Sequence, residues 1–269
     1  MEMGEREKFI FHKANINMKF NRDNFVEIYQ KILKYPMFSV NDTTEISHEF
    51  KNKGQIKLQA KKAVNIEDEE KFFAILYLLQ TGKAKIVEKI ELKSFNTTAS
   101  VIEVKISDIS ELTNCNSYEH ILDSVRKISS CTLEIFMFEK GKAKKTFFTY
   151  FFPFYEYISE KKVLNIFIDD RILIACQKKP LKLNIADYLC LKGHAKNLYK
   201  YLSSNVSKEK FHIYTITKRC HIKAKRKSEI KRAVKRALIT VGKTQMFRGK
   251  KITIKDDFIY LKNSPFQNK

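Results

Sequence analysis

The sequence predicts an α+β protein with two tandem winged helix-turn-helix domains and an additional N-terminal segment. Three observations predict this fold class. A succession of helix, strand, short helix, longer helix and two-stranded hairpin, which is the order of a winged helix, occurs twice along the chain. The longer helix of the second copy is amphipathic and strongly basic. Positive charge is concentrated in the C-terminal third, which separates the second copy from the first.

Residues 1–66 are expected to form an accessory segment, packed on the first domain or part of it. Apolar residues at helical spacing predict a helix over residues 22–33 that ends near Pro36. Residues 47–59 have the composition of strands around Gly54. Neither element belongs to the winged-helix succession, so we interpret the segment as an addition to it.

The first winged-helix domain is expected over residues 67–177. Its opening helix begins with acidic residues, which suit a helix N-terminus, and ends before Gly82. Ser107 is the expected cap of a short helix. The expected elements are a helix at 67–80, strands at 84–92 and 100–106, helices at 107–115 and 117–130, a hairpin of 132–138 and 146–152, and a strand with a short apolar segment over 163–175.

The second winged-helix domain is expected over residues 181–269, after a boundary around Pro180. Three tyrosines near its start are interpreted as packing residues: Tyr188, Tyr199 and Tyr201. The expected elements are one or two helices within 185–205, a strand at 211–215, a short helix at 217–222 with Thr217 as cap, a basic helix at 228–241, and strands at 247–254 and 258–262. The two domains share this succession without a residue-level repeat.

The basic helix of the second domain has two opposite faces. At 100° per residue the apolar residues fall on one face and the cations on the other. The apolar face has Ile230, Val234, Ala237, Leu238 and Val241, and the cationic face has Lys231, Arg232, Lys235 and Arg236. Ser228 is the expected N-cap and Glu229 the first-turn acid.

After Glu229 this helix has no acid that would offset the repulsion between its cations. An external polyanion is therefore expected to neutralise them. A helix about 10 Å across fits the major groove of duplex DNA, which is about 12 Å wide. A basic helix that is only solvated is the alternative interpretation.

Net charge also separates the two domains. The chain has 52 Lys and Arg against 30 Asp and Glu, a net charge of +22. Residues 181–269 hold 23 basic and 5 acidic residues, whereas the rest of the chain holds 29 and 25. This asymmetry favours a nucleic-acid partner over an anionic membrane surface. The N-terminus is charged and no apolar run reaches 18 residues, so we expect a cytoplasmic protein, associated with the nucleoid or a plasmid and with no membrane.

Motifs for catalysis or metal binding are absent from the sequence. The five cysteines form no CxxC pair, so reduced thiols are expected. The stretch 237–244, ALITVGKT, is similar to a phosphate-binding loop, but it ends a basic helix instead of following a strand. Asp169–Asp170 and Asp256–Asp257 are interpreted as turn residues. We therefore expect a binding protein with no catalytic residues, no metal and no cofactor.

The candidate DNA-contacting residues lie on the two longer helices, their flanks and their hairpins. Arg232 and Arg236 are the first choice for base contacts, because arginine can donate two hydrogen bonds to guanine. The second domain contributes Thr217, Lys218, Lys223, Lys225, Arg226, Lys227, Lys231, Arg232, Lys235, Arg236, Arg248, Lys250, Lys251 and Lys255. The first domain contributes Arg126 and Lys127 of a nearly neutral helix, and Lys142, Lys144 and Lys145 of its wing tip. If about six of these cations neutralise phosphates, log K should fall against log salt with a slope of about −5.

The stretch from Tyr118 to Asn205 resembles a known family. ILDSVRKISSCTLEIF is similar to a first recognition helix running into a strand, and TFFTYFFPFYEYISEKKVLNIFIDDRILIACQ is similar to the wing and closing strands that follow. GHAKNLYKYLSSN, with Leu198 and Tyr199, is similar to the helix that opens the second domain. These stretches resemble the iteron-binding plasmid replication initiator (Rep) proteins, which carry two winged-helix domains.

The resemblance implies a replication initiator without an active site of its own. In that family the second domain supplies most of the grip on repeated origin sequences, and the first assists on DNA and can mediate dimerisation. Recruitment of host replication proteins, including the replicative helicase, and repression of the initiator's own promoter are also implied. Three other functions stay open: a transcription regulator of a mobile element or virus, an enzyme on nucleic acid such as an ATPase or nicking protein, and a non-specific architectural or RNA-binding protein.

Overall fold

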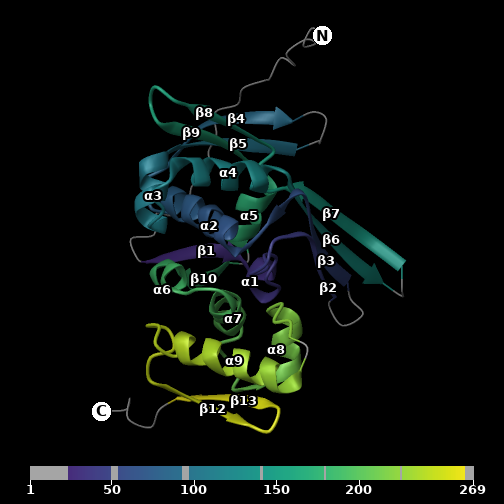
Figure 1. Ribbon diagram of the computed structural model, residues 1–269. Coiled ribbons are helices and arrows are strands. Elements are labelled where there is room, and N and C mark those ends of the chain that lie inside the picture. Colours follow the sequence, from purple (N-terminus) through teal and green to yellow (C-terminus); the bar gives the residue numbers. More distant parts are fainter. Residues whose placement is uncertain are drawn as a thin grey trace.

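The part of the chain that the structure describes has a mixed α/β fold. The computed structural model describes residues 24–49, 54–92, 97–139, 142–178, 180–224 and 226–263. An N-terminal module, residues 24–178, fills the upper part of Figure 1, and a C-terminal module, residues 185–263, lies below it in green and yellow. Across these ranges we find no helix long and apolar enough to cross a membrane.

Two four-stranded antiparallel sheets belong to the N-terminal module, with strand orders β2-β3-β6-β7 and β4-β5-β9-β8. Strand β3 pairs with β6 from Gly54 opposite Met137 to Ala60 opposite Cys131. The segment before the first long helix therefore extends the sheet of the β6–β7 hairpin. The strands are β2 (Thr43–Glu49), β3 (Gly54–Val64), β4 (Lys85–Leu92), β5 (Thr97–Lys105), β6 (Cys131–Glu139), β7 (Lys142–Tyr150), β8 (Phe154–Ile158) and β9 (Val163–Asp169).

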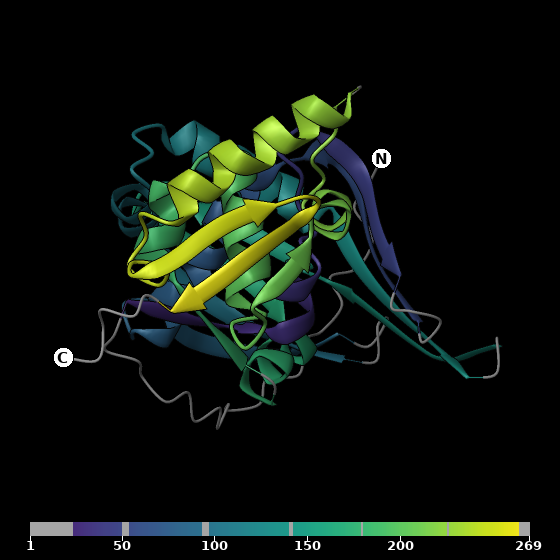
Figure 2. The same cartoon turned by 90° about the horizontal axis from the view of Figure 1, so that it is seen from below.

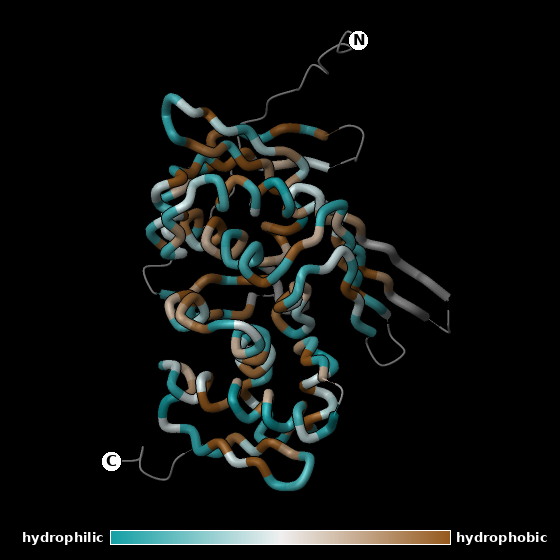
Figure 3. The backbone as a smooth tube through the Cα atoms, viewed as in Figure 1, coloured by the Kyte–Doolittle hydropathy of each residue, from teal (hydrophilic) through white to brown (hydrophobic). Residues whose placement is uncertain are grey.

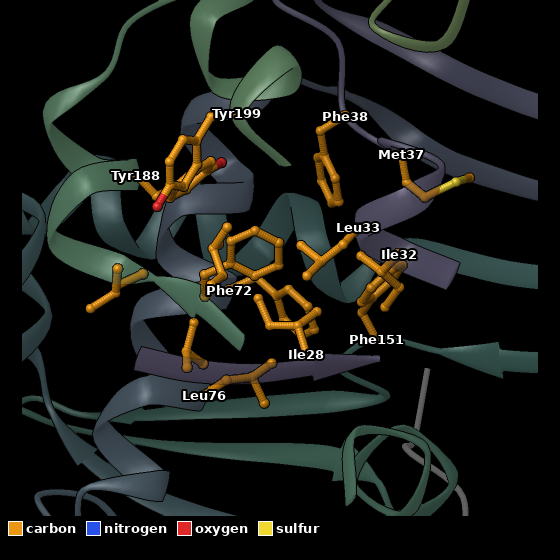
Figure 4. Packing of buried hydrophobic residues seen from close by; sticks show 14 of the residues in the cluster. Ile28, Ile32, Leu33, Met37, Phe38, Phe72, Leu76, Phe151, Tyr188 and Tyr199 are labelled. Atoms are coloured by element: carbon orange, nitrogen blue, oxygen red, sulfur yellow. The ribbon is translucent and has the colours of Figure 1, made fainter. Parts of the chain in front are cut away.

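Helix α2 (Ile66–Gln80) forms the centre of the N-terminal module. Asn65 and Asp68 close a capping box at its start, in which each side chain accepts from the other residue's backbone N–H. Phe72 is fully buried, and its ring meets that of Phe151 edge-on with centroids 5.0 Å apart (Figure 4). Around it lie α3 (Ile106–Thr113), α4 (Tyr118–Ser129) and α5 (Asp170–Lys178). Helix α3 begins before Ser107, so Ser107 does not cap it.

The first described element corrects the helix expected over residues 22–33. Phe25–Tyr29 form strand β1, and only Gln30–Lys34 form a helix, α1. Strand β1 pairs antiparallel with β10 (Pro180–Asn184), so a two-stranded sheet lies where the boundary around Pro180 was expected. Val26 and Ile28 both have 0% exposure, a period of two that places alternate strand residues in the core. Pairing with β10 makes this stretch a strand instead of a helix, and β10 lies far away in the sequence.

The C-terminal module has the predicted succession of elements, with shifted boundaries. The short helix begins near residue 213 instead of Thr217, because the His212 ring accepts from the Tyr214 N–H and caps the helix there. The basic helix begins at Lys227, so Ser228 lies in its first turn and does not cap it. The elements are α6 (Ile185–Cys190), α7 (His194–Ser203), β11 (Lys210–His212), α8 (Ile213–Arg219), α9 (Lys227–Val241), β12 (Lys250–Lys255) and β13 (Phe258–Asn263), with sheet order β11-β13-β12.

Asp169 and Asp170 are buried where β9 runs into α5, and they are not the turn residues that the sequence suggested. Asp170 accepts from the hydroxyls of Thr98 and Ser100, each at 2.6 Å, and pairs with Lys89 at 2.8 Å. The Asp169 carboxylate accepts from side chains on β7 and at the start of α5. The two carboxylates therefore join neighbouring elements of the N-terminal module.

A buried ionic cluster joins α2 to α7. Lys200 of α7 forms an ion pair with Glu69 of α2, and both side chains have 0% exposure. The Tyr188 hydroxyl donates to the same carboxylate at 2.8 Å, and Lys196 pairs with Glu70 at 2.8 Å. Burial lowers the pKa of Lys200, while the attraction to Glu69 opposes that shift. One hydrophobic core also spans both modules. The C-terminal module is therefore held against the N-terminal module both by this core and by the ion pairs between α7 and α2.

Candidate nucleic-acid interface

Helix α9 presents its cations on the side turned away from the protein. Val234, Ala237, Leu238 and Val241 are buried, which confirms the apolar face predicted from the sequence. This face packs on α7 and α8. Figure 2 shows α9 at the edge of the molecule, beside β12 and β13. Figure 3 shows hydrophilic and hydrophobic residues alternating along the helix.

Three cations on the exposed face of α9 are Arg232, Lys235 and Arg236. In the part of the chain that the structure describes, no carboxylate forms an ion pair with them. Their mutual repulsion is therefore not offset from within this part of the protein. The face is suited to an anionic partner, whose attraction would exceed that repulsion.

Lys227 and Lys231, at the start of α9, are held by the turn between β12 and β13. Asp256 and Asp257 form this turn, as the sequence predicted, and Asp256 has a φ of 55°. The Asp257 carboxylate lies 3.0 Å from the Lys227 ammonium and 2.9 Å from that of Lys231. Hydrogen bonds from the two lysines lower the pKa of Asp257 to about 2. This Asp257 tether aligns the hairpin with α9, and it occupies two lysines that the sequence assigned to DNA.

A groove of about 840 Å³ lies between the exposed side of α9 and strand β12. Its wall includes the aliphatic side chains of Ile239, Ile252 and Ile254. No acidic residue is among the described residues that line it. The cations that line it are Lys231, Arg232, Lys235, Lys243 and Lys250. The groove thus combines an apolar wall with positive charge, and we call it the α9–β12 groove.

The hairpin supplies further cations around this groove. Arg248, Lys251 and Lys255 are exposed on β12 or just before it. Lys243 was not among the candidates from the sequence, because it follows the end of the helix in the stretch that is similar to a phosphate loop. Only the fold of the turn after α9 brings Lys243 to the groove.

The opposite flank of α9 faces the start of α7. A hollow of about 400 Å³ there is lined by Arg236, Lys192 and His194, among others. Lys192 also lines a hollow of about 630 Å³ that includes Lys127 of α4. The surroundings of α9 and α4 are therefore connected through Lys192. Sequence reasoning missed Lys192 and His194, since single polar residues at the start of a helix have no distinguishing pattern.

The cations of α4 have acidic partners within the N-terminal module. Lys127 pairs with Asp123 at 2.9 Å and lies 4.0 Å from Asp68. Arg126 lies 3.7 Å from Asp123, and its Nε donates to the Tyr155 hydroxyl at 3.4 Å. The hydrogen bond from Lys127 lowers the pKa of Asp123. These pairs leave α4 with less attraction for phosphate than α9.

The other candidates have different surroundings. Thr217 is 7% exposed and its hydroxyl donates to the Tyr214 carbonyl, because α8 starts earlier than expected and Thr217 lies inside it. It is therefore a structural residue, which corrects its assignment to DNA. The exposed candidates near α8 and the start of α9 are Lys218, Lys223 and Arg226. Outside the described part lie Lys225 and the side chains of Lys142, Lys144 and Lys145.

The stretch 237–244 does not form a phosphate-binding loop. Its first part is the last turn of α9, and Gly242 is the C-cap with a helical φ of −61°. A phosphate-binding loop follows a strand and opens a helix, whereas this stretch follows a helix and precedes a strand. Among the residues with described positions, no group of three or more His, Cys, Asp or Glu side chains could hold a metal ion.

Similar solved structures include two of RctB. A selenomethionine derivative of domains 2 and 3 of RctB has a TM-score of 0.53 and 11% identity, and the match covers 87% of this chain and 98% of that chain. A second structure of RctB domains 2–3 has a TM-score of 0.46 and 12% identity, and this match covers 87% of this chain and 96% of that chain. No family model matches the sequence, and a search of curated proteins finds no match. At 11% sequence identity, the likeness to the selenomethionine derivative shows a similar fold.

Proposed function

We propose that the protein binds double-stranded DNA sequence-specifically and initiates plasmid-type replication at repeated origin sites. The observation that carries this proposal is the cationic face of α9, which the Asp257 tether holds beside a cationic hairpin. The major groove of B-DNA accepts one helix, and its phosphate edges suit the cations around the α9–β12 groove. The likeness to domains 2 and 3 of RctB supports an initiator-like fold.

Both modules are winged helices in this proposal. In the C-terminal module, α7, β11, α8, α9 and the β12–β13 hairpin follow in the winged-helix order, so α9 is the recognition helix and the hairpin is the wing. In the N-terminal module the corresponding elements are α2, α3, α4 and the β6–β7 hairpin. The domains span residues 67–177 and 181–269, and within the N-terminal segment of residues 1–66 the strands β2 and β3 extend a sheet of the first domain.

The N-terminal module assists the C-terminal module, whose helix α9 makes the main contacts with DNA in this proposal. Its helix α4 has weaker attraction for phosphate because Asp123 balances its cations. Dimerisation through this module, recruitment of host replication proteins such as the replicative helicase, and repression of the protein's own promoter complete the proposed role. The protein acts in the cytoplasm by binding, without catalysis.

Binding of the purified protein to a fragment library from its source, at about 150 mM salt to weaken phosphate contacts, tests the proposal. We expect recovery of clustered direct repeats near the protein's own gene, and a plasmid carrying those repeats should replicate in an origin-transformation assay. A lone palindrome at a promoter, without origin activity, would identify a transcription regulator instead. Equal recovery of all fragments would overturn sequence-specific binding.

A further inference from the structure

Ile239 lies in the last turn of α9 and, by rotation about the helix axis, in the middle of its exposed face, the side that would meet the bases of bound DNA. At 100° per residue it falls opposite Ile230, between Lys235 and Arg232. Its side chain is 56% exposed. A β-branched residue has a lower helix propensity than Ala, Lys or Glu, and an exposed one gains little from burial. Folding of α9 therefore gives no reason for isoleucine at this position.

Ile239 is part of an apolar strip within the α9–β12 groove. Ile254 of β12, which is 37% exposed, lines the same groove together with Ile252. Isolated exposed apolar side chains are common and need no explanation. Here, however, two of them come from separate elements to one groove, and every charged residue among the described residues that line it is a cation. A ligand that fits both parts is anionic along its edges and apolar at one point.

Duplex DNA has this combination of properties. Phosphates follow both edges of the major groove, and the thymine C5-methyl group is the apolar group on the base edges. We propose that Ile239 packs against a thymine methyl group of the cognate site and thereby helps to determine its sequence. This inference rests on the proposed function, because it takes duplex DNA as the occupant of the groove.

Helix geometry gives the position of this thymine relative to the arginine contacts. Arg232 lies seven residues before Ile239 on the same stripe, about 10 Å along the axis at ~1.5 Å per residue. Successive base pairs are about 3.4 Å apart. A helix that follows the groove therefore places the thymine about three base pairs from the base that Arg232 contacts.

A uracil scan tests the inference. Duplexes are first selected from a random-sequence library at about 150 mM salt. Each thymine of an enriched duplex is then replaced in turn by deoxyuridine, which lacks only the methyl group. At one position the wild-type protein should lose affinity about fourfold, as expected for one buried methyl group. Ile239→Ala should bind the thymine duplex more weakly and should be insensitive to uracil at that position.

Ile174→Ala is the matched control, because it removes the same atoms from an exposed position of α5. It should keep the wild-type uracil profile, and both variants should keep the wild-type Tm. Identical profiles for wild type and Ile239→Ala would overturn this inference alone, because the selected duplex would still be bound without a thymine methyl contact at Ile239. A selection that enriches no sequence would overturn the proposed function and this inference with it.

Discussion

Helices α4 and α9 each follow a short helix and precede a hairpin, but the charges around them differ. In α4 the cations Arg126 and Lys127 lie beside Asp123 of the same helix. In α9 the one acid is Glu229, in the first turn, and the Asp257 tether comes from the hairpin and reaches only the start of the helix. The position of the acidic partners therefore distinguishes the two helices.

This difference has a direct consequence for a bound polyanion. A phosphate that approaches Arg126 or Lys127 also approaches the Asp123 carboxylate, which repels it. Near Arg232, Lys235 and Arg236 the structure describes no paired carboxylate. Cation number alone is thus a poor guide to where a polyanion binds, because acids held by the fold cancel part of the attraction.

The largest effect is expected for Arg232→Ala/Arg236→Ala. The double variant should lose about 2–6 kcal/mol of binding free energy on the selected duplex, at ~1–3 kcal/mol per good base contact. Arg126→Ala/Lys127→Ala is the matched pair in α4 and should lose less. Fluorescence anisotropy titrations at one salt concentration measure both losses. Equal losses would mean that α4 and α9 contribute equally to DNA binding, which would contradict the difference inferred from their acidic partners.

The next largest effect is expected in the free energy of unfolding, through the ion pair that joins α7 to α2. Lys200→Met leaves the Glu69 carboxylate buried without its cation. The free energy of unfolding should fall by about 3–5 kcal/mol, the usual cost of breaking a buried pair from one side. Urea denaturation measures the change. Lys200→Met/Glu69→Gln is the control and should recover much of the loss; unchanged stability in the single variant would contradict a role in joining the modules.

A histidine contact between the modules predicts a dependence on pH. The Nε2 atoms of His48 and His221 are 3.2 Å apart, and they lie 2.9 and 3.0 Å from the Pro36 carbonyl oxygen. Burial lowers the pKa of His48 from 6.5 to about 3 and also lowers that of His221. At pH values between about 3 and 6.5, His48 of the unfolded chain binds a proton that His48 of the folded chain does not. The free energy of unfolding should therefore decrease as the pH falls from about 6.5 towards 3.

For His48 alone the expected loss is about 2 kcal/mol between pH 7 and pH 5. His48→Gln keeps a hydrogen-bond donor for the Pro36 carbonyl but has no titrating group. Chemical denaturation of wild type and variant at both pH values measures the difference. A variant that loses as much stability as the wild type over this range would show that His48 is not responsible.

The smallest effect is expected in the salt dependence of DNA binding. Lys235→Gln should make the slope of log K against log salt less steep by about 0.9, the value for one phosphate contact. Lys127→Gln should change the slope less, because Lys127 is paired with Asp123. Titrations between about 50 and 200 mM salt compare the two variants. A larger change for Lys127→Gln would reverse the ranking of α4 and α9.

The opposite faces of α9, the position of its hairpin and the concentration of charge in the C-terminal third could all be predicted from the amino-acid sequence. These features depend on spacing within one helix or on composition, so they survive without knowledge of distant partners. The aspartates of the hairpin turn were also predicted correctly.

Which candidate residues are accessible and which are paired could be seen only from the packing of the folded chain. The first part of the predicted helix at 22–33 is instead strand β1, which pairs with β10, and Thr217 is buried. The fold also brings Asp257 to Lys227 and Lys231, and Lys243 and Ile239 to one groove. Strand pairing, ion pairs and grooves depend on residues that are distant in sequence, and local periodicity has no information on them.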